Sequence, residues 1–330
     1  MTTYVKSITT QSLKEAKEIL LAGGAVAFPT ETVYGLGADA RSNKAVAEIY
    51  KIKGRPSDNP LIVHIHKDFD LSSLIQNEKP YVAALREAFL PGPLTLVYES
   101  RGTVSAKVSC GLNTLAIRVP SHEGAQSFLR YTNIPIAAPS ANISKHVSPV
   151  TAEHVLFDLD GKVPLILDGG QCSGGIESTV CDVTGDIPVV LRSGLISREM
   201  IESVVGCCES YKMCEGGVAR SPGMKYKHYS PCCETKLFTS GCIEEALGLF
   251  RELTANGKRV YVLCENNTVK YFPANTVLNL GENGYEMAAN LYKLLRKAES
   301  VADMVIAIEP TQKGGVMEGV LNRLRKACAE

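Results

Sequence analysis

The chain has 330 residues, a length that predicts two domains, since a domain commonly holds about 100–200 residues. It carries 35 Lys and Arg against 35 Asp and Glu, and a net charge of zero argues against an extended nucleic-acid surface. Hydrophobic residues make up 45% and charged residues 21%, which excludes general disorder. No apolar run reaches the roughly 18 residues that cross a bilayer, and the N-terminus lacks the apolar core of a signal peptide. We therefore expect a cytoplasmic protein without membrane contact.

The eleven cysteines are scattered, and no Cys-x-x-Cys pair occurs among them. Zinc-ribbon and thioredoxin-like sites lose their main support for this reason. In a reducing compartment such residues usually behave as small hydrophobic side chains or unreactive thiols. We expect the same of Cys207, Cys208, Cys214, Cys232 and Cys233, whose spacing is irregular.

In chain order, the N-terminal part alternates helix and strand patterns. An amphipathic helix is predicted over 12–21, with Ser12 as N-cap and Gly23-Gly24 as its stop. A buried strand follows at 25–28, and a second helix covers about 44–50. Ser121 and Ser197 are predicted to cap two further helices, which end near Arg130 and before Gly206. The remaining strand candidates are 61–66, 94–98, 115–119, 134–138, 165–168, 179–183 and 189–191.

Residues 207–235 interrupt this alternation with glycines, prolines and no sustained period, so they are predicted to be a linker. The predicted domains are therefore 1–206 and 236–330. The second is predicted to be a mainly parallel α/β unit, since its strand and helix patterns alternate. Its strand candidates are 236–239, 259–264 and 304–309, and its helix candidates are 243–254, 285–301 and 315–327.

The segment PTETVYGLGADA, residues 29–40, contains the spacing Gly35-x-Gly37-x-x-Ala40. It matches a dinucleotide fingerprint only weakly, because Pro29 and five other residues separate its first glycine from the preceding strand. We instead expect a loop that presents Thr30, Glu31, Thr32 and Tyr34 over a cleft.

Two cations, Lys53 and Arg55, stand two residues apart in the segment KIKGRPSDNP. In an extended chain this spacing places both side chains on one face, where they would suit a polyphosphate or a carboxylate. His64 and His66 also share a predicted strand face. No third ligand stands at a recognisable spacing, so we do not expect these histidines to bind a metal.

Small polar residues follow a predicted buried strand at Ser140 and Asn142, which is where α/β sheets bind ligands. The glycine-rich turns at 168–170 and 174–179 could offer backbone N–H groups to an anion, or could be simple turns. No Walker A motif is present, so any ATP site would lack a P-loop.

Together, five separated motifs and the linker resemble the threonylcarbamoyl-AMP synthase family in its long, two-domain form. The motifs are PTETVYGLGADA, Lys53-x-Arg55, Ser140-x-Asn142, Ser178–Val180 and Leu191–Gly194, and the linker segment is SPGMKYKHYSP, Ser221–Pro231. The resemblance covers nearly the whole chain. It implies a catalytic domain with a twisted mixed α/β sheet and a large concave cavity, followed by a small Rossmann-like α/β domain.

The resemblance implies an enzyme that converts L-threonine, bicarbonate or CO2, and ATP into threonylcarbamoyl-AMP and pyrophosphate. The Mg²⁺ cofactor would be held by the ATP phosphates. A separate tRNA threonylcarbamoyl-transferase complex would use the product next to the anticodon, and direct tRNA binding by this chain would be weak or absent.

The resemblance also assigns residues to three roles. The catalytic set is Lys53, Arg55, Ser140 and Asn142; the ATP-binding set is Arg55, Asn59, Thr114, Ser140, Ser148, Arg192, Tyr226 and Tyr229; the threonine-binding set is Thr32, His64, Arg118, Ala138 and Ser178.

Three other functions remain possible on the sequence. Residues 41–67 carry a charge of +4, which would suit an RNA-binding module without catalysis, although few aromatics accompany it. A carbamoyl-transferase of hydrogenase maturation has a related domain, but it adds zinc-finger cysteine pairs that this chain lacks. A NAD-linked dehydrogenase would need an acidic residue at the end of the next strand, whereas Asp58 lies in a polar turn.

Overall fold

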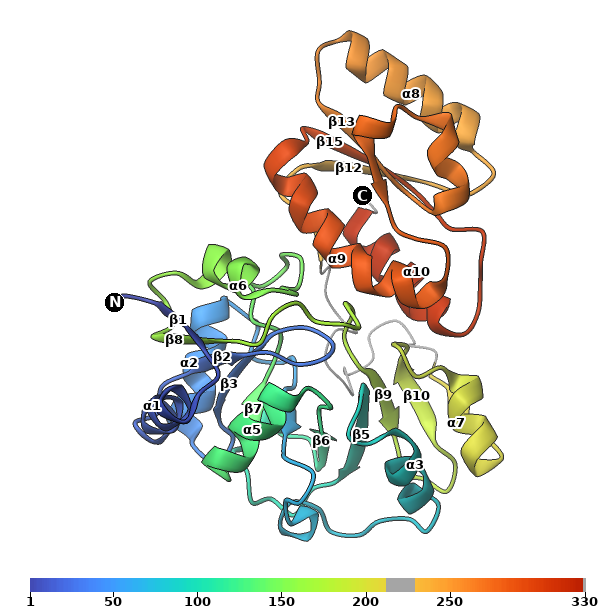
Figure 1. Ribbon diagram of the computed structural model, residues 1–330. Helices are drawn as coiled ribbons and strands as arrows, with labels where there is room; N and C mark the ends of the chain where they lie inside the picture. Colours follow the sequence, from blue (N-terminus) through green and yellow to red (C-terminus); the bar gives the residue numbers. More distant parts are fainter. Residues whose placement is uncertain (212–228, 329–330) are drawn as a thin grey trace.

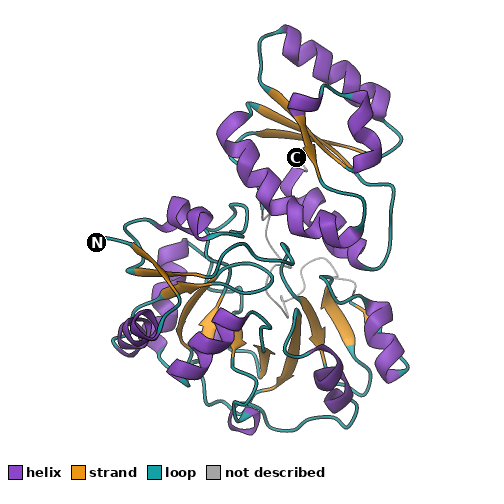
Figure 2. Ribbon diagram, in the orientation of Figure 1, coloured by secondary structure: helices purple, strands orange, loops and turns teal. Residues whose placement is uncertain are grey.

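The computed structural model describes residues 1–211 and 229–328, which form two α/β units (Figures 1 and 2). The N-terminal unit is built on an 11-stranded sheet in the order β1-β8-β2-β3-β7-β4-β6-β5-β9-β10-β11. The C-terminal unit is built on a 4-stranded sheet in the order β12-β15-β13-β14. The architecture confirms the predicted class, a mixed α/β sheet followed by a smaller Rossmann-like α/β unit.

The described strands are β1 (Tyr4–Ser7), β2 (Val26–Phe28), β3 (Gly35–Asp39), β4 (Ile62–His64), β5 (Leu94–Glu99), β6 (Thr114–Arg118), β7 (Ile136–Ala138), β8 (Leu165–Asp168), β9 (Thr179–Asp182), β10 (Val189–Arg192), β11 (Glu209–Ser210), β12 (Glu234–Phe238), β13 (Val260–Cys264), β14 (Val277–Asn279) and β15 (Met304–Ile308). The described helices are α1 (Thr10–Leu21), α2 (Asn43–Lys53), α3 (Val82–Phe89), α4 (Ala106–Ser109), α5 (Glu123–Thr132), α6 (Ala152–Leu159), α7 (Arg198–Val205), α8 (Ile243–Ala255), α9 (Gly284–Val301) and α10 (Val316–Cys328), with 3₁₀ turns at Leu71–Ser73, Asn266–Tyr271 and Ala274–Thr276.

We expected residues 29–40 to form a loop, but Gly35–Asp39 form strand β3. The expectation was therefore wrong for the residues after Tyr34. β3 lies antiparallel between β2 and β7. A Cβ at Gly37 would come within 2.7 Å of Ile136 and 2.9 Å of Phe28, so this glycine permits close packing of the strand. Because no helix starts at these glycines, the dinucleotide fingerprint is excluded.

Two predicted helix caps were wrong by a few residues. Thr9 caps α1, and Ser12 stands at the third helical position, where the two residues form a capping box. His122, rather than Ser121, caps α5 by accepting from the N–H groups of Gly124 and Ala125. Ser197 does cap α7, as predicted.

Helix α2 runs through Lys53 and ends at Gly54, which adopts the left-handed conformation with φ 59°. The expectation that Lys53 and Arg55 lie in extended chain was therefore wrong. The αL turn at Gly54 reverses the chain direction, and both side chains still reach the same pocket.

The C-terminal sheet is parallel throughout its described strands, as predicted. Helix α8 covers the face away from the N-terminal unit, whereas α9 and α10 lie between the two units (Figure 1). Buried side chains of α9 and α10, among them Leu291 and Val320, belong to the same apolar cluster as the core of the larger unit. The two units thus share one continuous core.

The segment predicted as a linker starts in the larger sheet, because β11 pairs with β10. The linker segment on which the family resemblance depends, Ser221–Pro231, lies mostly outside the described residues. Cys214 and Tyr226 also lie outside them. None of the described helices is long and apolar enough to cross a membrane.

Candidate active site

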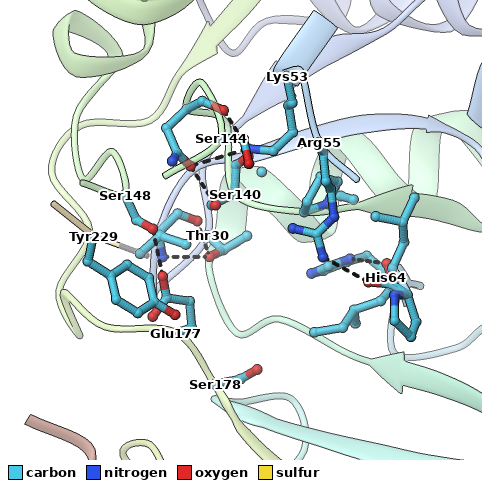
Figure 3. A pocket seen from close by; sticks show the side chains of 18 of the residues that line it. Thr30, Lys53, Arg55, His64, Ser140, Ser144, Ser148, Glu177, Ser178 and Tyr229 are labelled. Carbon is cyan, nitrogen blue, oxygen red and sulfur yellow. Dashed lines mark hydrogen bonds between the residues drawn. The ribbon is translucent and has the colours of Figure 1, made fainter. Parts of the chain in front are cut away.

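A pocket that encloses about 740 Å³ of space, part of it open to solvent, lies in the N-terminal unit (Figure 3). It is lined by residues of β4, by the ends of β7 and β10, and by the segment that leads into β9. Its lining includes eleven of the fifteen residues predicted from the resemblance: Lys53, Arg55, His64, Arg118, Ala138, Ser140, Asn142, Ser148, Ser178, Arg192 and Tyr229.

Lys53 is held by three oxygens of the segment after β7. Its Nζ donates to the carbonyls of Ser140 and Asn142, and to Asn142 Oδ1 at 3.3 Å. The Ser140 hydroxyl donates to the same Oδ1 at 2.6 Å. Only 2% of Lys53 is exposed, and burial, followed by the charge of Arg55, lowers its pKa well below the usual value. Lys53 therefore fixes the Ser-x-Asn segment.

Arg55 is anchored by the turn that follows it. Its Nε and Nη2 donate to the carbonyls of Asn59 and Pro60, at 3.3 and 3.1 Å. Burial lowers the pKa of Arg55 to about 10, so the guanidinium stays charged at neutral pH. The remaining donors of its fork are available to an anion in the pocket.

Glu177 forms the opposite wall and was not singled out from the sequence (Figure 3). Ser148 donates to its Oε1 at 2.6 Å, and Tyr292 and Arg323 donate to its Oε2 at 2.9 and 3.2 Å. Burial opposes ionisation, but Arg323, Arg192 and the Ser148 hydroxyl outweigh it and lower the pKa of Glu177 to about 2. Glu177 is thus a carboxylate with both oxygens engaged.

The threonine-binding set lies around Arg118 at the end of β6. Arg118 Nη1 donates to Thr32 Oγ1 at 2.8 Å, and its Nη2 lies 2.8 Å from Glu31 Oε1. Its Nε is buried without a hydrogen-bond partner among the described residues. Burial, followed by the charge of Arg118, lowers the pKa of His64 to about 3, so this imidazole is neutral near pH 7.

Arg192 lies against Ser178 at the start of β9. Its Nε and Nη2 donate to the Ser178 carbonyl at 3.1 and 2.9 Å, and Nη2 also reaches the Ser178 hydroxyl at 3.2 Å. These hydrogen bonds connect two of the family motifs, Leu191–Gly194 and Ser178–Val180. A fourth cation therefore faces the same pocket as Lys53, Arg55 and Arg118.

Three predicted residues do not line the pocket, and a fourth lies outside the described residues. Thr32 lies behind Arg118, which it contacts. Asn59 is 1% exposed, and both atoms of its amide lack a hydrogen-bond partner among the described residues. Thr114 begins β6 outside the lining, and Tyr226 is not described.

The expectation that Tyr34 faces the cleft was wrong: Tyr34 is fully buried, and its hydroxyl donates to the Gly170 carbonyl at 2.8 Å. The N–H groups of Gly169, Gly170 and Gly174 already donate within the protein, which favours simple turns over an anion cradle at these glycines. His66 lies beyond the end of β4, and its Nε2 forms a hydrogen bond with Asn133 Oδ1 at 3.0 Å.

Besides Glu177, sequence reasoning missed two residues of the C-terminal unit. Tyr292 and Arg323 lie in plain helical patterns more than 100 positions from Glu177, and nothing local marks them. Among the described residues, no group of three or more His, Cys, Asp or Glu side chains could hold a metal ion.

Two family models match adjoining parts of the chain. One, described as "Telomere recombination", matches residues 18–194, and the other, described as "Threonylcarbamoyl-AMP synthase, C-terminal domain", matches 196–329. Curated threonylcarbamoyl-AMP synthases are similar over most of their length. The Pyrococcus abyssi protein is 42% identical over 92% of this chain and 90% of its own, and the Bacillus subtilis protein is 42% identical over 96% and 92%.

A crystal structure of P. abyssi Sua5 complexed with L-threonine matches with a TM-score of 0.89 and 38% identity, covering 99% of this chain and 96% of that one. This likeness includes both units and their arrangement. With the cation-lined pocket, the family models and the curated relatives in agreement, the chain belongs to the threonylcarbamoyl-AMP synthase family and is an enzyme of that family.

Proposed function

We propose that this pocket condenses L-threonine, bicarbonate or CO2, and MgATP into threonylcarbamoyl-AMP, with release of pyrophosphate. The observation that carries the proposal is the convergence of Lys53, Arg55, Arg118 and Arg192 on one cavity. A site with four fixed cations suits a substrate set that combines a triphosphate with a carboxylate.

The threonine end is supported by Arg118 and His64. A buried guanidinium whose Nε has no hydrogen-bond partner within 1–211 and 229–328 suits an amino-acid carboxylate, and a relative in this family has been crystallised with L-threonine. A neutral His64 beside it can accept or donate a hydrogen bond without adding charge. Ser178 and Ala138 complete that side of the lining.

The chemical step needs no nucleophilic side chain. The threonine amine attacks the carbon of CO2 and loses a proton, or attacks bicarbonate with loss of water, and either route gives a carbamate. A carbamate oxygen then attacks the α-phosphorus, and the bond to the leaving pyrophosphate breaks. Negative charge develops on phosphate oxygens, where the remaining donors of Arg55 would stabilise it, while Lys53 would hold the Ser140–Asn142 segment in place.

Mg²⁺ enters this proposal as part of the MgATP substrate. Glu177 is the carboxylate in the described lining, and both of its oxygens already accept hydrogen bonds. The ATP phosphates therefore provide the better ligands for the ion. When bound, the ion would neutralise charge on the transferred and leaving phosphates.

The product would serve a separate tRNA-modifying complex, in keeping with the cytoplasmic location expected from the sequence. The test is an omission series in which threonylcarbamoyl-AMP is detected by mass spectrometry and pyrophosphate by a coupled assay. Both should require L-threonine, bicarbonate, ATP and Mg²⁺ together. Full pyrophosphate release in CO2-free buffer, or equal release with glycine, would contradict the proposal.

A further inference from the structure

The C-terminal unit reaches the pocket wall through buried side chains of α9 and α10. Tyr292 from α9 and Arg323 from α10 both donate to Glu177 Oε2, and both are fully buried. Arg323 Nη1 also donates to the Ser193 carbonyl, next to the pocket residue Arg192. Glu177 therefore receives two of its three side-chain hydrogen bonds from the other unit.

Tyr292 also contacts a second pocket residue. Its ring stacks on the ring of Tyr229, with centroids 5.3 Å apart and an interplanar angle of 30°. Tyr229 is 6% exposed, has φ 69°, and is followed by Ser230, whose N–H donates to the Lys145 carbonyl. One side chain of α9 thus supports both Glu177 and Tyr229.

The backbones of α9 and α10 approach the N-terminal unit more closely than side chains at an ordinary contact between two surfaces would allow. A Cβ at Gly175 would lie 2.2 Å from the carbonyl oxygen of Ala288 in α9. A Cβ at Gly319 in α10 would lie 3.1 Å from the Gly194 backbone. Helix backbones therefore press directly against the two glycine turns that flank Glu177 and Arg192, and the position of these turns depends on the helices.

We propose that Tyr292 and Arg323 are positioning residues of the active site: both act through Glu177 on Ser148, and Tyr292 also acts directly on Tyr229. The C-terminal unit then contributes to nucleotide binding without touching the nucleotide itself. Loss of the Tyr292 hydroxyl frees Glu177 Oε2 on one side and lets Ser148, which bonds the other oxygen, move. This inference extends the proposed function, from which it takes the nucleotide as the ligand beside Ser148 and Tyr229.

The test compares Tyr292→Phe with Tyr285→Phe, the same chemical change on the same helix. Tyr285 is 57% exposed and lies outside the pocket lining, so its variant should behave as wild type. Tyr292→Phe keeps the ring that stacks on Tyr229 and removes the hydroxyl that donates to Glu177 and that also forms a hydrogen bond with Tyr229. We expect its Kd for MgATP, measured by calorimetry, to rise on the order of 10-fold, since a hydrogen bond to a charged group is lost. The KM for L-threonine should stay unchanged, because Arg118 and His64 lie outside this network.

A second comparison shows whether the effect passes through Glu177. In a Glu177→Ala background, Tyr292→Phe should raise the Kd for MgATP no further. Arg323→Lys, which keeps the charge, should lose less affinity than Arg323→Met. Equal Kd values for Tyr292→Phe and Tyr285→Phe would overturn the inference, and so would an additive loss in the Glu177→Ala background.

Hydrogen exchange of the ligand-free protein gives a readout that does not depend on the reaction. Peptides covering residues 143–148 and 174–180 should exchange faster in Tyr292→Phe than in Tyr285→Phe, while β13 and β15 stay unchanged. If wild type forms no threonylcarbamoyl-AMP but these differences appear, the proposed function fails and the positioning role stands. Unchanged exchange in both peptides would overturn the positioning role whatever the enzyme makes.

Discussion

Lys53 and Asn142 meet across the pocket, with Nζ 3.3 Å from Oδ1, and join two motifs that lie 89 positions apart. The same ammonium donates to two backbone carbonyls, so its three donors match three acceptors. Arg55, two residues later, keeps part of its fork directed to the cavity. The two cations of this motif therefore have different roles: Lys53 holds the pocket wall together, and Arg55 is directed towards the substrate.

This difference predicts unequal effects of substitution. Arg55→Ala should reduce turnover by about 10²–10³, as expected for the loss of one donor to a developing anion, with little change in melting temperature. Lys53→Met should lower both turnover and stability, because it leaves buried oxygens without donors at about 1–3 kcal/mol. Steady-state kinetics and urea unfolding of both variants measure this.

Arg55→Lys provides the matched control, since it keeps the charge but loses the bidentate fork. Its turnover should fall between those of Arg55→Ala and wild type. A large loss of stability in Arg55→Ala with unchanged activity of the folded fraction would mean that Arg55 is structural.

Buried His64 predicts the direction of the pH dependence of stability. Its pKa is about 3 in the folded protein, because of burial and Arg118, against an ordinary value of 6.5. The stabilisation is complete above pH 6.5 and is lost as the pH falls towards 3, since unfolding then takes up a proton. The free energy of unfolding should fall by up to about 1.4 kcal/mol per pH unit for this group.

His154 contributes with the same sign, because burial and Arg296 lower its pKa to about 4. His64→Gln should therefore reduce the slope between pH 6 and 4 but not remove it, as measured by urea unfolding at each pH. The wild-type activity profile should show no inflection near 6.5 from His64. An unchanged slope in His64→Gln would contradict the assignment.

The sequence predicted the helices and strands that have clear periodicity or caps, such as α7 and β15, and it placed Ser140 and Asn142 after a strand. It could not place β3, because a glycine-rich strand between two others lacks the usual β-branched residues. It missed Glu177 as a site residue for a different reason. The environment of that carboxylate is made by Tyr292 and Arg323, whose approach depends on how two units pack. Burial and long-range pairing of this kind are tertiary properties that no local pattern encodes.

A second ion pair between the units predicts strong coupling in stability. Arg296 of α9 makes two hydrogen bonds with Asp158 of α6, at 3.0 and 2.7 Å, and the exposed fractions of the side chains are 3% and 0%. Arg296→Met leaves Asp158 as a buried charge and should cost about 3–5 kcal/mol, whereas Asp158→Leu should cost less, because Glu299 still pairs with Arg296 at 3.3 Å. The double variant should lose less than the sum of the two single losses, because the charges of Arg296 and Asp158 are removed together.

Unfolding in urea gives the free energies for this double-mutant cycle. The exposed pair Arg259–Asp303, whose closest atoms are 2.6 Å apart, is the control, and its single variants should stay near wild type because water screens that pair. Additive losses in the buried pair would contradict the coupling.

Glycines at the contact between the units predict graded effects of added methyl groups. At Gly175 a Cβ would overlap the Ala288 carbonyl at 2.2 Å, and φ is +74°, a region that other residues rarely adopt. Gly175→Ala should therefore push α9 away from the larger unit, with a large drop in melting temperature and in MgATP affinity. At Gly319 the nearest atoms are 3.1 Å away, so Gly319→Ala should cause a smaller loss of both melting temperature and MgATP affinity.

Gly248→Ala is the matched control. Gly248 is exposed in α8, nothing lies within 4 Å of a Cβ added there, and a helix interior favours alanine over glycine by about 0.5–1 kcal/mol. That variant should melt at or above the wild-type temperature and bind MgATP normally. Calorimetric melting and MgATP titration of the three proteins measure the series, and wild-type affinity in a folded Gly175→Ala protein would mean that the pocket does not depend on this contact.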